Sequence, residues 1–556
     1  MQHVVYRALA QVPDIVKGRF ENSFNSTVLK FLFNRGVLSE EDYKAKYSIT
    51  ELESPSMLSG IRKSADKLLK FIKDKKKIVI YGDYDADGIV SSYLLYDFVT
   101  NVLGYKNIWV WLPNRFNDGY GLSKKNLEYI ETFADVVITV DCGIRDTKLI
   151  QQFSGQLEFM ILDHHEIPDE VPKVPIVHPF MKQKAGKIAP TSAGVTVFKF
   201  ISFIAQGMKL DLKLVQEHLY KYIDIASLTI VTDVMPVVGE NRLLLKFAIE
   251  KGRKDPHPFI ENMFFIIEKD IKKLSSSDFG FFLGPRINAT GRLYDPTLSF
   301  KALYKPDNMW LKYIDEINTH RQDVVSGIQD NMFDYFKITD NKIIVVFDKN
   351  ISEGVIGLVA GNLVKKYNLP AIVCTFDNNG KIKCSARSVR NVHIVDIFDK
   401  VSNCLDKYGG HSQAAGCTLK KDKSVQDFVK AINNVSVLIS DIVYKDVDDV
   451  VTPVTLTASL VESLEKFAPF GTDNASYKLL LKGKITNIFK TQTGKVGLEI
   501  SEKEHIVRTY FSKLNKDVYL GQKVYIYGRP FMGNNKDDVM FWGNEVIDFL
   551  EYVWIE

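Results

Sequence analysis

The chain has 556 residues, of which 46% are hydrophobic and 25% are charged. These values are ordinary for a globular protein and exclude a largely disordered chain, while the length implies roughly three to four domains. The net charge of +4, from 72 basic and 68 acidic residues, is too small to prove a polyanionic partner, so any nucleic-acid prediction must rest on specific sites.

The cysteines and the chain start indicate a compartment. Five cysteines are spread along the chain without a Cys-x-x-Cys pair, namely Cys142, Cys374, Cys384, Cys404 and Cys417. Their odd number and wide spacing favour neither a disulfide framework nor a structural zinc site. The first residues lack the apolar segment of a signal peptide, and no uninterrupted apolar run reaches about 18 residues. We therefore expect a soluble, cytoplasmic protein with no membrane partner.

The first part of the chain predicts a helical lead-in followed by an α/β domain. Residues 1–75 are charged and mostly helical in pattern. Over 76–295, strands and helices alternate, which predicts a doubly wound parallel sheet. The expected strands are 77–81, 107–112, 136–140 and 157–162, and the longer helical patterns are 192–206, 213–232 and 241–252.

The rest of the chain predicts a second α/β domain and a small barrel. Residues 296–340 combine helical periodicity with many charges, as expected of a long connecting helix. A second α/β domain should span 341–440, and the mixed segment 441–476 should be a linker. Residues 477–556 contain short β-rich runs interrupted by glycines, which predicts an OB-like β-barrel. The strands expected in the second α/β domain are 343–347, 371–376 and 381–386, with helices near 355–367, 393–404 and 424–439.

Three carboxylates follow the first strand of the first α/β domain. The β-branched run 78–80 predicts a buried strand, and Asp83, Asp85 and Asp87 come directly after it. Ligands of open α/β sheets bind outside the carboxyl ends of the strands. Three carboxylates within five residues repel one another, and a bound cation relieves that repulsion. A solvated acidic turn or a helix N-cap is the alternative, but three carboxylates favour a metal.

Further potential ligands end the later elements of this domain. Asp141 follows the strand 136–140, His164 and His165 follow the strand 157–162, and Asp233 ends a helix. Singly, a histidine pair or a helix-ending aspartate is more often structural. Together these carboxylates and imidazoles favour two Mn²⁺ or Mg²⁺ ions over structural zinc. Two such ions could share a bridging aspartate and activate water between them.

Four of these stretches resemble a known family. Residues 81–88, 140–143, 162–166 and 232–236 are similar to the four motifs of the DHH phosphoesterase superfamily, and within it to the RecJ family of single-strand-specific 5′→3′ DNA exonucleases. The resemblance covers about 75–475, with two departures. Residues 351–353 are Ile-Ser-Glu where the family usually has Trp-His-Gln, and Cys384 stands where the family usually has glycine. Supporting stretches are 113–116, 119–122, 239–242, 284–292, 354–357, 385–388, 409–411 and 469–471.

The resemblance implies roles for individual residues. One metal ion would be held by Asp83, Asp85 and Asp141. The second would be held by Asp87, Asp141, His164 and Asp233, with Asp141 bridging the ions and His165 facing the scissile phosphate. The substrate-binding residues implied by the family are Arg115, Arg286, Asn288, Ser385, Arg387, Gly409, Gly410 and His411. Among these, Arg115, Arg286, Ser385 and Arg387 would surround a terminal 5′-phosphate, for which forked guanidinium donors are well suited.

Each of these binding residues also has a simpler interpretation. A single arginine is more often a surface charge, Gly409 and Gly410 could form only a turn, and His411 could be a core residue. In the predicted barrel, aromatic residues accompany lysines, a combination that OB-folds use to bind unpaired bases. Many of those rings must instead form the barrel core.

The leading hypothesis is therefore a metal-dependent 5′→3′ exonuclease acting on single-stranded DNA in recombination and repair. A phosphodiesterase of cyclic dinucleotides or short oligonucleotides is an alternative, although it would need neither the connecting segment nor the barrel. A non-catalytic replication scaffold is another alternative, although loss of the aspartates would be expected in it. The family also suggests a helicase and a single-strand-binding protein as partners, and we expect a monomer.

Overall fold

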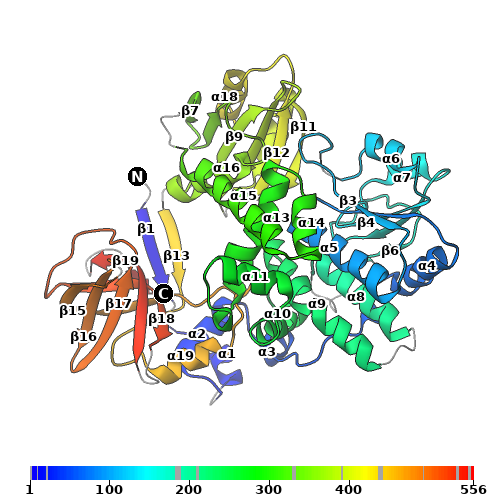
Figure 1. The fold of residues 1–556 in the computed structure, drawn as a ribbon. Helices are drawn as coiled ribbons and strands as arrows, with labels where there is room; N and C mark the ends of the chain where they lie inside the picture. The colour runs from blue at the N-terminus through cyan, green and yellow to red at the C-terminus, as the bar shows by residue number, and fades with distance from the viewer. Residues whose placement is uncertain are drawn as a thin grey trace. The chain divides into compact units, whose positions relative to one another are not determined.

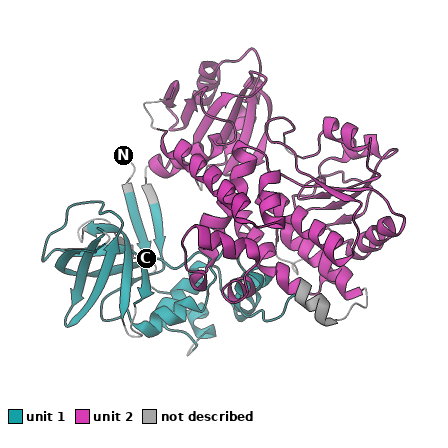
Figure 2. Cartoon of the chain, viewed as in Figure 1, with its two compact units in different colours: residues 1–52, 236–246, 440–556 teal, residues 53–235, 247–439 magenta. Residues whose placement is uncertain are grey.

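The structure is a computed structural model of the chain (Figure 1). It describes residues 3–8, 11–20, 23–119, 121–181, 190–207, 212–328, 333–389, 392–435, 442–492, 494–533, 538–548 and 553–555. The chain forms two compact units, which have different colours in Figure 2. Unit 1 consists of residues 1–52, 236–246 and 440–556, and unit 2 consists of residues 53–235 and 247–439.

The first half of unit 2 contains a parallel sheet of five strands in the order β3-β2-β4-β5-β6. This sheet confirms the predicted doubly wound α/β fold. Its strands are β2 (Ile78–Tyr81), β3 (Ile108–Trp111), β4 (Val136–Val140), β5 (Glu158–Leu162) and β6 (Ile176–Val177). The helices of this half are α4 (Ile61–Lys73), α5 (Ala86–Asp97), α6 (Lys124–Ile130), α7 (Thr147–Phe153), α8 (Ala193–Gly207), α9 (Leu212–Thr232), α11 (Pro258–Ile266) and α12 (Ser276–Asp278).

Helices cover both faces of this sheet (Figure 1). Every residue of β2 and β4 is buried, as the unbroken apolar runs predict. Alternate residues, such as Val79, Val137 and Phe159, pack with Leu127 of α6 and Phe153 of α7 in one core cluster. The residues between them are equally buried and face the other side. Because successive side chains of a strand point to opposite faces, this pattern requires two covered faces.

The second half of unit 2 contains a mixed sheet of six strands in the order β11-β12-β10-β9-β8-β7. The strands are β7 (Tyr335–Ile338), β8 (Ile344–Phe347), β9 (Ala371–Phe376), β10 (Ile382–Arg387), β11 (Leu405–His411) and β12 (Ala414–Leu419). Its helices are α16 (Ile356–Tyr367), α17 (Ile394–Lys400) and α18 (Val425–Asn433). Between the two halves lie α13 (Gly284–Leu293), α14 (Thr297–Tyr304) and the connecting helix α15 (Asn308–Ser326).

Unit 1 contains a closed barrel of five strands, which confirms the OB-like prediction. The strand order is β15-β16-β17-β19-β18, and β18 pairs back onto β15. The barrel strands are β15 (Leu479–Lys490), β16 (Val496–Glu502), β17 (His505–Phe511), β18 (Lys523–Met532) and β19 (Val539–Asp548). The other elements of unit 1 are β1 (His3–Ala8), α1 (Asp14–Arg19), α2 (Ser26–Asn34), α3 (Glu40–Tyr47), β13 (Ile442–Val447), β14 (Asp449–Val451), α19 (Ala458–Glu465) and β20 (Val553–Ile555). The helix α10 (Gly239–Gly252) begins in unit 1 and ends in unit 2.

The lead-in is mostly helical, as expected, since it contains α1 to α4, but it also contains β1, which pairs in parallel with β13 and β20. Two other local predictions were wrong. The range 296–340 holds two separate helices and the strand β7, whereas a single helix was expected. The linker predicted at 441–476 contains β13, β14 and α19, and Leu464 of α19 is fully buried in the barrel core. Residues 436–439 of the predicted helix 424–439, and residue 441, lie outside the described residues.

The sequence suggested no disulfide framework, and one cysteine pair nevertheless lies together in the structure. The structure joins Cys374 and Cys384 by a disulfide. The two residues lie directly opposite each other on the antiparallel strands β9 and β10, with their Cα atoms 4.0 Å apart. Sequence spacing alone did not reveal this pair, because the pairing register of two strands brings the residues together.

Candidate metal centre and phosphate pocket

The predicted metal ligands lie at the carboxyl ends of neighbouring parallel strands. β4 lies between β2 and β5 in the sheet. Asp83 follows β2, Asp141 follows β4 and His164 follows β5. The last turn of α9 brings Asp233 to the same place, since its side chain lies 3.5 Å from His164. The strand order therefore converts positions far apart in sequence into one cluster.

The cluster contains three sets of side chains whose ligand atoms lie within 4.8 Å of one another. The sets are Asp83, Asp85 and Asp141; Asp87, His164 and Asp233; and Asp141, His164 and His165. Asp141 belongs to two sets, and its Oδ1 lies 3.2 Å from His164 Nε2. The same nitrogen lies 3.6 Å from Asp87 Oδ2. This geometry can accommodate two ions that share Asp141.

Hydrogen bonds to the backbone hold the first carboxylates in place. Asp85 is the N-cap of α5, and its Oδ1 accepts hydrogen bonds from the amides of Asp87 and Gly88 at 3.0 and 3.2 Å. The Asp87 carboxylate accepts bonds from the amides of Ala193 and Gly194 at 2.8 and 2.7 Å. Those amides begin α8, so the helix dipole also favours the charge of Asp87. Asparagine in place of Asp85 or Asp87 would keep the size of the side chain but lose the negative charge that strengthens these bonds.

Asp163 orients the second histidine of the pair. Its Oδ1 lies 2.8 Å from Nδ1 of His165, and its Oδ2 accepts a bond from the amide of Ile144 at 3.0 Å. Although burial opposes ionisation, the bond to His165 keeps the pKa of Asp163 below its usual range. Burial disfavours the imidazolium of His165, but the bond to Asp163 raises its pKa overall. Asp163 therefore holds the Nδ1 side of the His165 ring, and Nε2 lies on the opposite side of the ring.

The electrostatics of the cluster are those of carboxylates forced together. Burial and the charge of Asp85 raise the pKa of Asp83 to about 8 and that of Asp87 to about 7. Burial and the neighbouring carboxylates raise the pKa of Asp233 to about 9 and that of Asp141 well above its usual value. Burial lowers the pKa of His164 to about 4, so this imidazole is neutral, as a metal ligand must be.

The donor set fits divalent cations. Asp83 Oδ1 and Asp233 Oδ2 are buried atoms without a hydrogen-bond partner. A buried carboxylate oxygen without a partner is costly, and a cation would satisfy it. Five carboxylates with one or two imidazoles are typical of Mn²⁺ or Mg²⁺ rather than of structural zinc.

A group of arginines lies beside the carboxylates. The guanidinium of Arg115 lies 4.1 Å from the ring centroid of Tyr84, and its Nε is buried without a hydrogen-bond partner. The guanidinium of Arg387 donates to Ala386 O at 2.8 Å and contacts Ser385 Oγ at 3.3 Å. Burial and the charge of Arg115 lower the pKa of Arg387. Among the described residues, no carboxylate lies within ion-pair distance of Arg115 or Arg387, so their charges are available to an anion.

The structure adds Arg292 to this group, a residue that the sequence reasoning did not select. The pKa of Arg292 is lowered to about 10, mainly by burial and further by the charges of Arg115, Arg321 and Arg387. The charge of Asp85 acts in the opposite direction. Its Nη1 lies 3.4 Å from Gly354 O. The available signal was its place in the stretch 284–292, one turn after Asn288.

Two predicted substrate residues have structural partners. Arg286 forms an ion pair with Asp315 at 2.7 Å and donates to Phe282 O at 2.9 Å, so its charge is already compensated. The side-chain oxygen of Asn288 accepts a bond from the amide of Ala86 at 2.8 Å. Asn288 therefore holds the loop that carries Asp85 and Asp87, and its contact with substrate stays a prediction.

The remaining substrate residues lie in register on one sheet. Gly409 and Ser385 are both opposite Gly416 of β12, and His411 and Arg387 are both opposite Ala414. Residues directly opposite one another share a face of the sheet. Gly409, Gly410 and His411 are exposed on the edge strand β11 and do not form the turn considered in the sequence. The structure thus aligns Gly409 and His411 with Ser385 and Arg387, whereas Gly410 is opposite Ala415 and belongs to the other face of the sheet.

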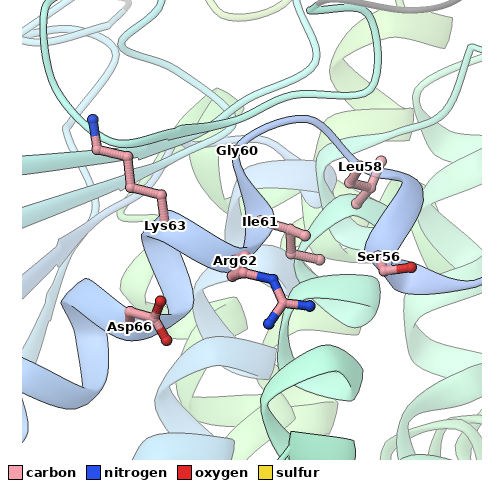
Figure 3. A pocket seen from close by; sticks show the side chains of 7 residues that line it. All are labelled: Ser56, Leu58, Gly60, Ile61, Arg62, Lys63 and Asp66. Atoms are coloured by element: carbon pink, nitrogen blue, oxygen red, sulfur yellow. The ribbon is translucent and has the colours of Figure 1, made fainter.

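A separate shallow depression of about 530 Å³ lies at the start of α4 (Figure 3). Its lining includes Arg62, Lys63 and Asp66, and the side chains of Arg62 and Lys63 point in different directions. It contains none of the predicted site residues. Across the described part of the chain, no helix has the length and apolar character required to cross a membrane.

Comparisons with known proteins agree with this architecture. Residues 77–230 match the DHH family, N-terminal domain, and residues 340–437 match the DHHA1 domain. The single-stranded-DNA-specific exonuclease RecJ of Bacillus subtilis is 28% identical over 477 residues, which cover 83% of this chain and 58% of that protein. The RecJ of Escherichia coli is 28% identical over 415 residues, covering 70% of this chain and 71% of that protein.

A solved structure supports the same fold. The crystal structure of RecJ in complex with Mn²⁺ from Thermus thermophilus has a TM-score of 0.82 and 19% identity, and the match covers 99% of this chain and 80% of that one. The chain spans little more than half the length of its Bacillus subtilis relative. The chain thus carries matches to the DHH and DHHA1 domains in that order and is similar to RecJ proteins over most of its length.

Proposed function

We propose that the chain is a metal-dependent 5′→3′ exonuclease that hydrolyses phosphodiester bonds of single-stranded DNA. The observation that carries this proposal is the buried cluster of carboxylates and histidines with uncompensated arginines next to it. The names of its relatives support the substrate, since the RecJ proteins of Bacillus subtilis and Escherichia coli are described as single-stranded-DNA-specific exonucleases.

The carboxylate cluster would hold two divalent ions. We assign Asp83, Asp85 and Asp141 to one ion, and Asp87, Asp141, His164 and Asp233 to the other. Bound Mn²⁺ or Mg²⁺ would supply Lewis-acid activation of water and would stabilise charge on the phosphate oxygens. The Thermus thermophilus RecJ structure in complex with Mn²⁺ supports this choice of metal.

His165 would act on the scissile phosphate. Asp163 binds Nδ1 of His165, which orients the ring and favours its protonated form. A protonated imidazole can donate a hydrogen bond to a phosphate oxygen and stabilise its charge. We propose that His165 has this role and that it does not hold a metal ion.

The arginine group would select the 5′ end of the strand. A terminal phosphate carries more charge than an internal phosphodiester, and no carboxylate in the described part of the chain pairs with Arg115, Arg292 or Arg387 to compete with it. We propose that these three residues, with Ser385, bind a 5′-phosphate. Gly409 and His411 would contact the strand on the same sheet face, and the exposed backbone of Gly410 between them would let the strand approach closely.

The decisive experiment uses single strands labelled at either end and incubated with Mn²⁺. Stepwise shortening from the 5′ end, with little activity on duplex DNA, is the expected result. Shortening from the 3′ end, or equal cleavage of both substrates, would contradict the proposal. A role in recombination and repair, a cytoplasmic location, a monomeric state, and partnership with a helicase and a single-strand-binding protein remain predictions.

A further inference from the structure

Two proposed ligands of the second ion, Asp87 and Asp233, come from different elements. Asp87 lies in the first turn of α5, and Asp233 directly follows α9. Their Oδ2 atoms lie 3.6 and 3.5 Å from the same nitrogen of His164. The distance between the two carboxylates therefore depends on how the elements that carry and hold them are joined.

The start of α8 holds the Asp87 carboxylate. The amides of Ala193 and Gly194 each donate to one of its oxygens, at 2.8 and 2.7 Å. Ser192 precedes them, and its Oγ accepts a hydrogen bond from the amide of Val195 at 3.4 Å, as the side chain of an N-cap residue does. A shift of Ser192 would therefore move the two amides that hold Asp87.

A buried pair of hydroxyls joins this helix start to the last turn of α9. Ser192 Oγ lies 2.7 Å from Thr229 Oγ1, and both residues are fully buried. Thr229 Oγ1 donates its one proton to Ala226 O at 2.7 Å, so it must accept the bond that it shares with Ser192. The amide of Asp233, one turn further along, donates to Thr229 O at 3.0 Å. The hydroxyl pair therefore links the segment that holds Asp87 to the segment that carries Asp233.

Gly194 allows the two helices to come this close. Figure 1 shows α8 and α9 side by side. A Cβ atom at position 194 would lie 2.5 Å from Thr229 Oγ1, so a side chain there would displace Thr229. The close approach at Gly194 and the hydroxyl pair thus fix the same junction.

We propose that the hydroxyl pair of Ser192 and Thr229 positions the second metal ion, because it sets the distance between Asp87 and Asp233. This inference rests on the proposed function and names residues outside the ligand set on which binding of that ion depends. Groups that orient metal ligands from behind typically change metal affinity by about tenfold to a hundredfold. Among the described residues, neither hydroxyl is bonded to a ligand assigned to the first ion, so breaking the pair should affect the second ion alone.

The test counts the Mn²⁺ ions bound to the full chain without DNA, from the electron paramagnetic resonance signal of free Mn²⁺. The unmodified protein should bind two ions. Thr229→Val keeps the size of the side chain but removes the hydroxyl, so it should weaken one of the two binding steps about tenfold or more and leave the other unchanged. Thr229→Ser keeps a hydroxyl and should bind both ions like the unmodified protein.

Thr290→Val is the matched control. Thr290 is also fully buried in unit 2, and its Oγ1 lies 2.9 Å from Ser299 Oγ. This second hydroxyl pair joins α13 to α14, and neither helix carries a proposed metal ligand. Thr290→Val should therefore lower the melting temperature without changing either binding step. If Thr290→Val weakens a step as much as Thr229→Val does, the effect is general destabilisation and the inference is wrong.

Unchanged binding of both ions by a folded Thr229→Val protein would overturn the inference, and so would equal weakening of both steps. Ser192→Ala is the second variant if Thr229→Val does not fold. It removes the donor of the pair, while Thr229 keeps its bond to Ala226 O, so no buried proton loses its acceptor. Ser192→Ala should also weaken a single step, and two unchanged steps in this variant would be equally decisive against the inference.

The outcome is distinguishable from failure of the proposed function, because the Mn²⁺ count needs neither DNA nor hydrolysis. A protein that binds two ions but does not shorten single strands would refute the exonuclease, and the comparison of Thr229→Val with Thr229→Ser would still decide the inference. If the unmodified protein binds fewer than two ions, the assignment of two ions fails and this inference fails with it.

Discussion

Substitution of Arg387 tests whether the arginine group recognises the end of the strand. The Arg387 guanidinium donates to Ala386 O and contacts Ser385, and no carboxylate of the described residues pairs with it. A 5′-phosphate would accept charge-assisted hydrogen bonds from it, each of about 1.5–3 kcal/mol. Since 1.4 kcal/mol corresponds to about one decade, the preference for a 5′-phosphate over a 5′-hydroxyl should fall about tenfold to a hundredfold in Arg387→Ala.

The same substitution should not harm the folded protein. Burial and the charge of Arg115 lower the pKa of Arg387, so the folded protein disfavours the charge of this guanidinium. Removing one of these like charges relieves the repulsion. The melting temperature of Arg387→Ala without DNA should therefore be equal to or higher than that of the unmodified protein.

The assay compares initial rates on two oligonucleotides that differ only in the 5′ group, with Mn²⁺ and limiting substrate. Arg286→Ala is the matched control, because Arg286 is already paired with Asp315. It should lower stability and affect both substrates alike. If Arg387→Ala also loses equal activity on both substrates, Arg387 supports the general strand path, and the end-pocket hypothesis is wrong.

Three further predictions concern the metal centre and the packing around it. Asp141→Asn should abolish cleavage and remove most of the increase in melting temperature that Mn²⁺ produces, and full activity measured in this variant would refute a shared ligand. In EDTA the melting temperature should fall as pH rises from about 5 to about 9. Folding raises the pKa values of Asp87, Asp83 and Asp233 to about 7, 8 and 9, so the protons on these carboxyls stabilise the folded state only at lower pH. Mg²⁺ should reduce this fall, and a melting temperature that rises with pH in EDTA, measured by calorimetry, would contradict the prediction. Gly354→Ala should destabilise the protein, since its Cβ would lie 1.8 Å from Arg292 O. Gly361→Ala, which has open space around it in the same region, should be neutral or stabilising by up to about 1 kcal/mol in chemical denaturation. Equal effects of the two substitutions would show that the contact at Arg292 is not tight.

The structure also changes how the barrel should be tested. Phe31 and Leu32 of α2 are buried in the same core cluster as Leu479 and Leu481 of β15. A truncation after residue 476 would expose both sides of that cluster and destabilise unit 1. Point substitutions are therefore the informative experiment.

The sequence by itself determined the sheet in the first half of unit 2 and the set of candidate ligands. The apolar runs that became β2, β4 and β5 have no polar alternation, and such runs are typical of strands buried on both faces. Parallel strands bring their carboxyl ends to one edge, so Asp83, Asp141 and His164 could be predicted to lie together from their positions after the strands. Local periodicity and chain direction were sufficient for both predictions.

Only the tertiary structure decided which of the polar residues have partners. Arg286 and Arg292 lie six positions apart on the same helix. Arg286 reaches the carboxylate of Asp315 on α15, whereas Arg292 pairs with no carboxylate among the described residues. Asn288 binds an amide that is 202 positions away in the chain. Such pairings depend on how separate elements pack and on which side chains face each other, and neither is encoded in the local periodicity of a segment. The same reason explains why Cys374 and Cys384 could be matched only once the register of their strands was known.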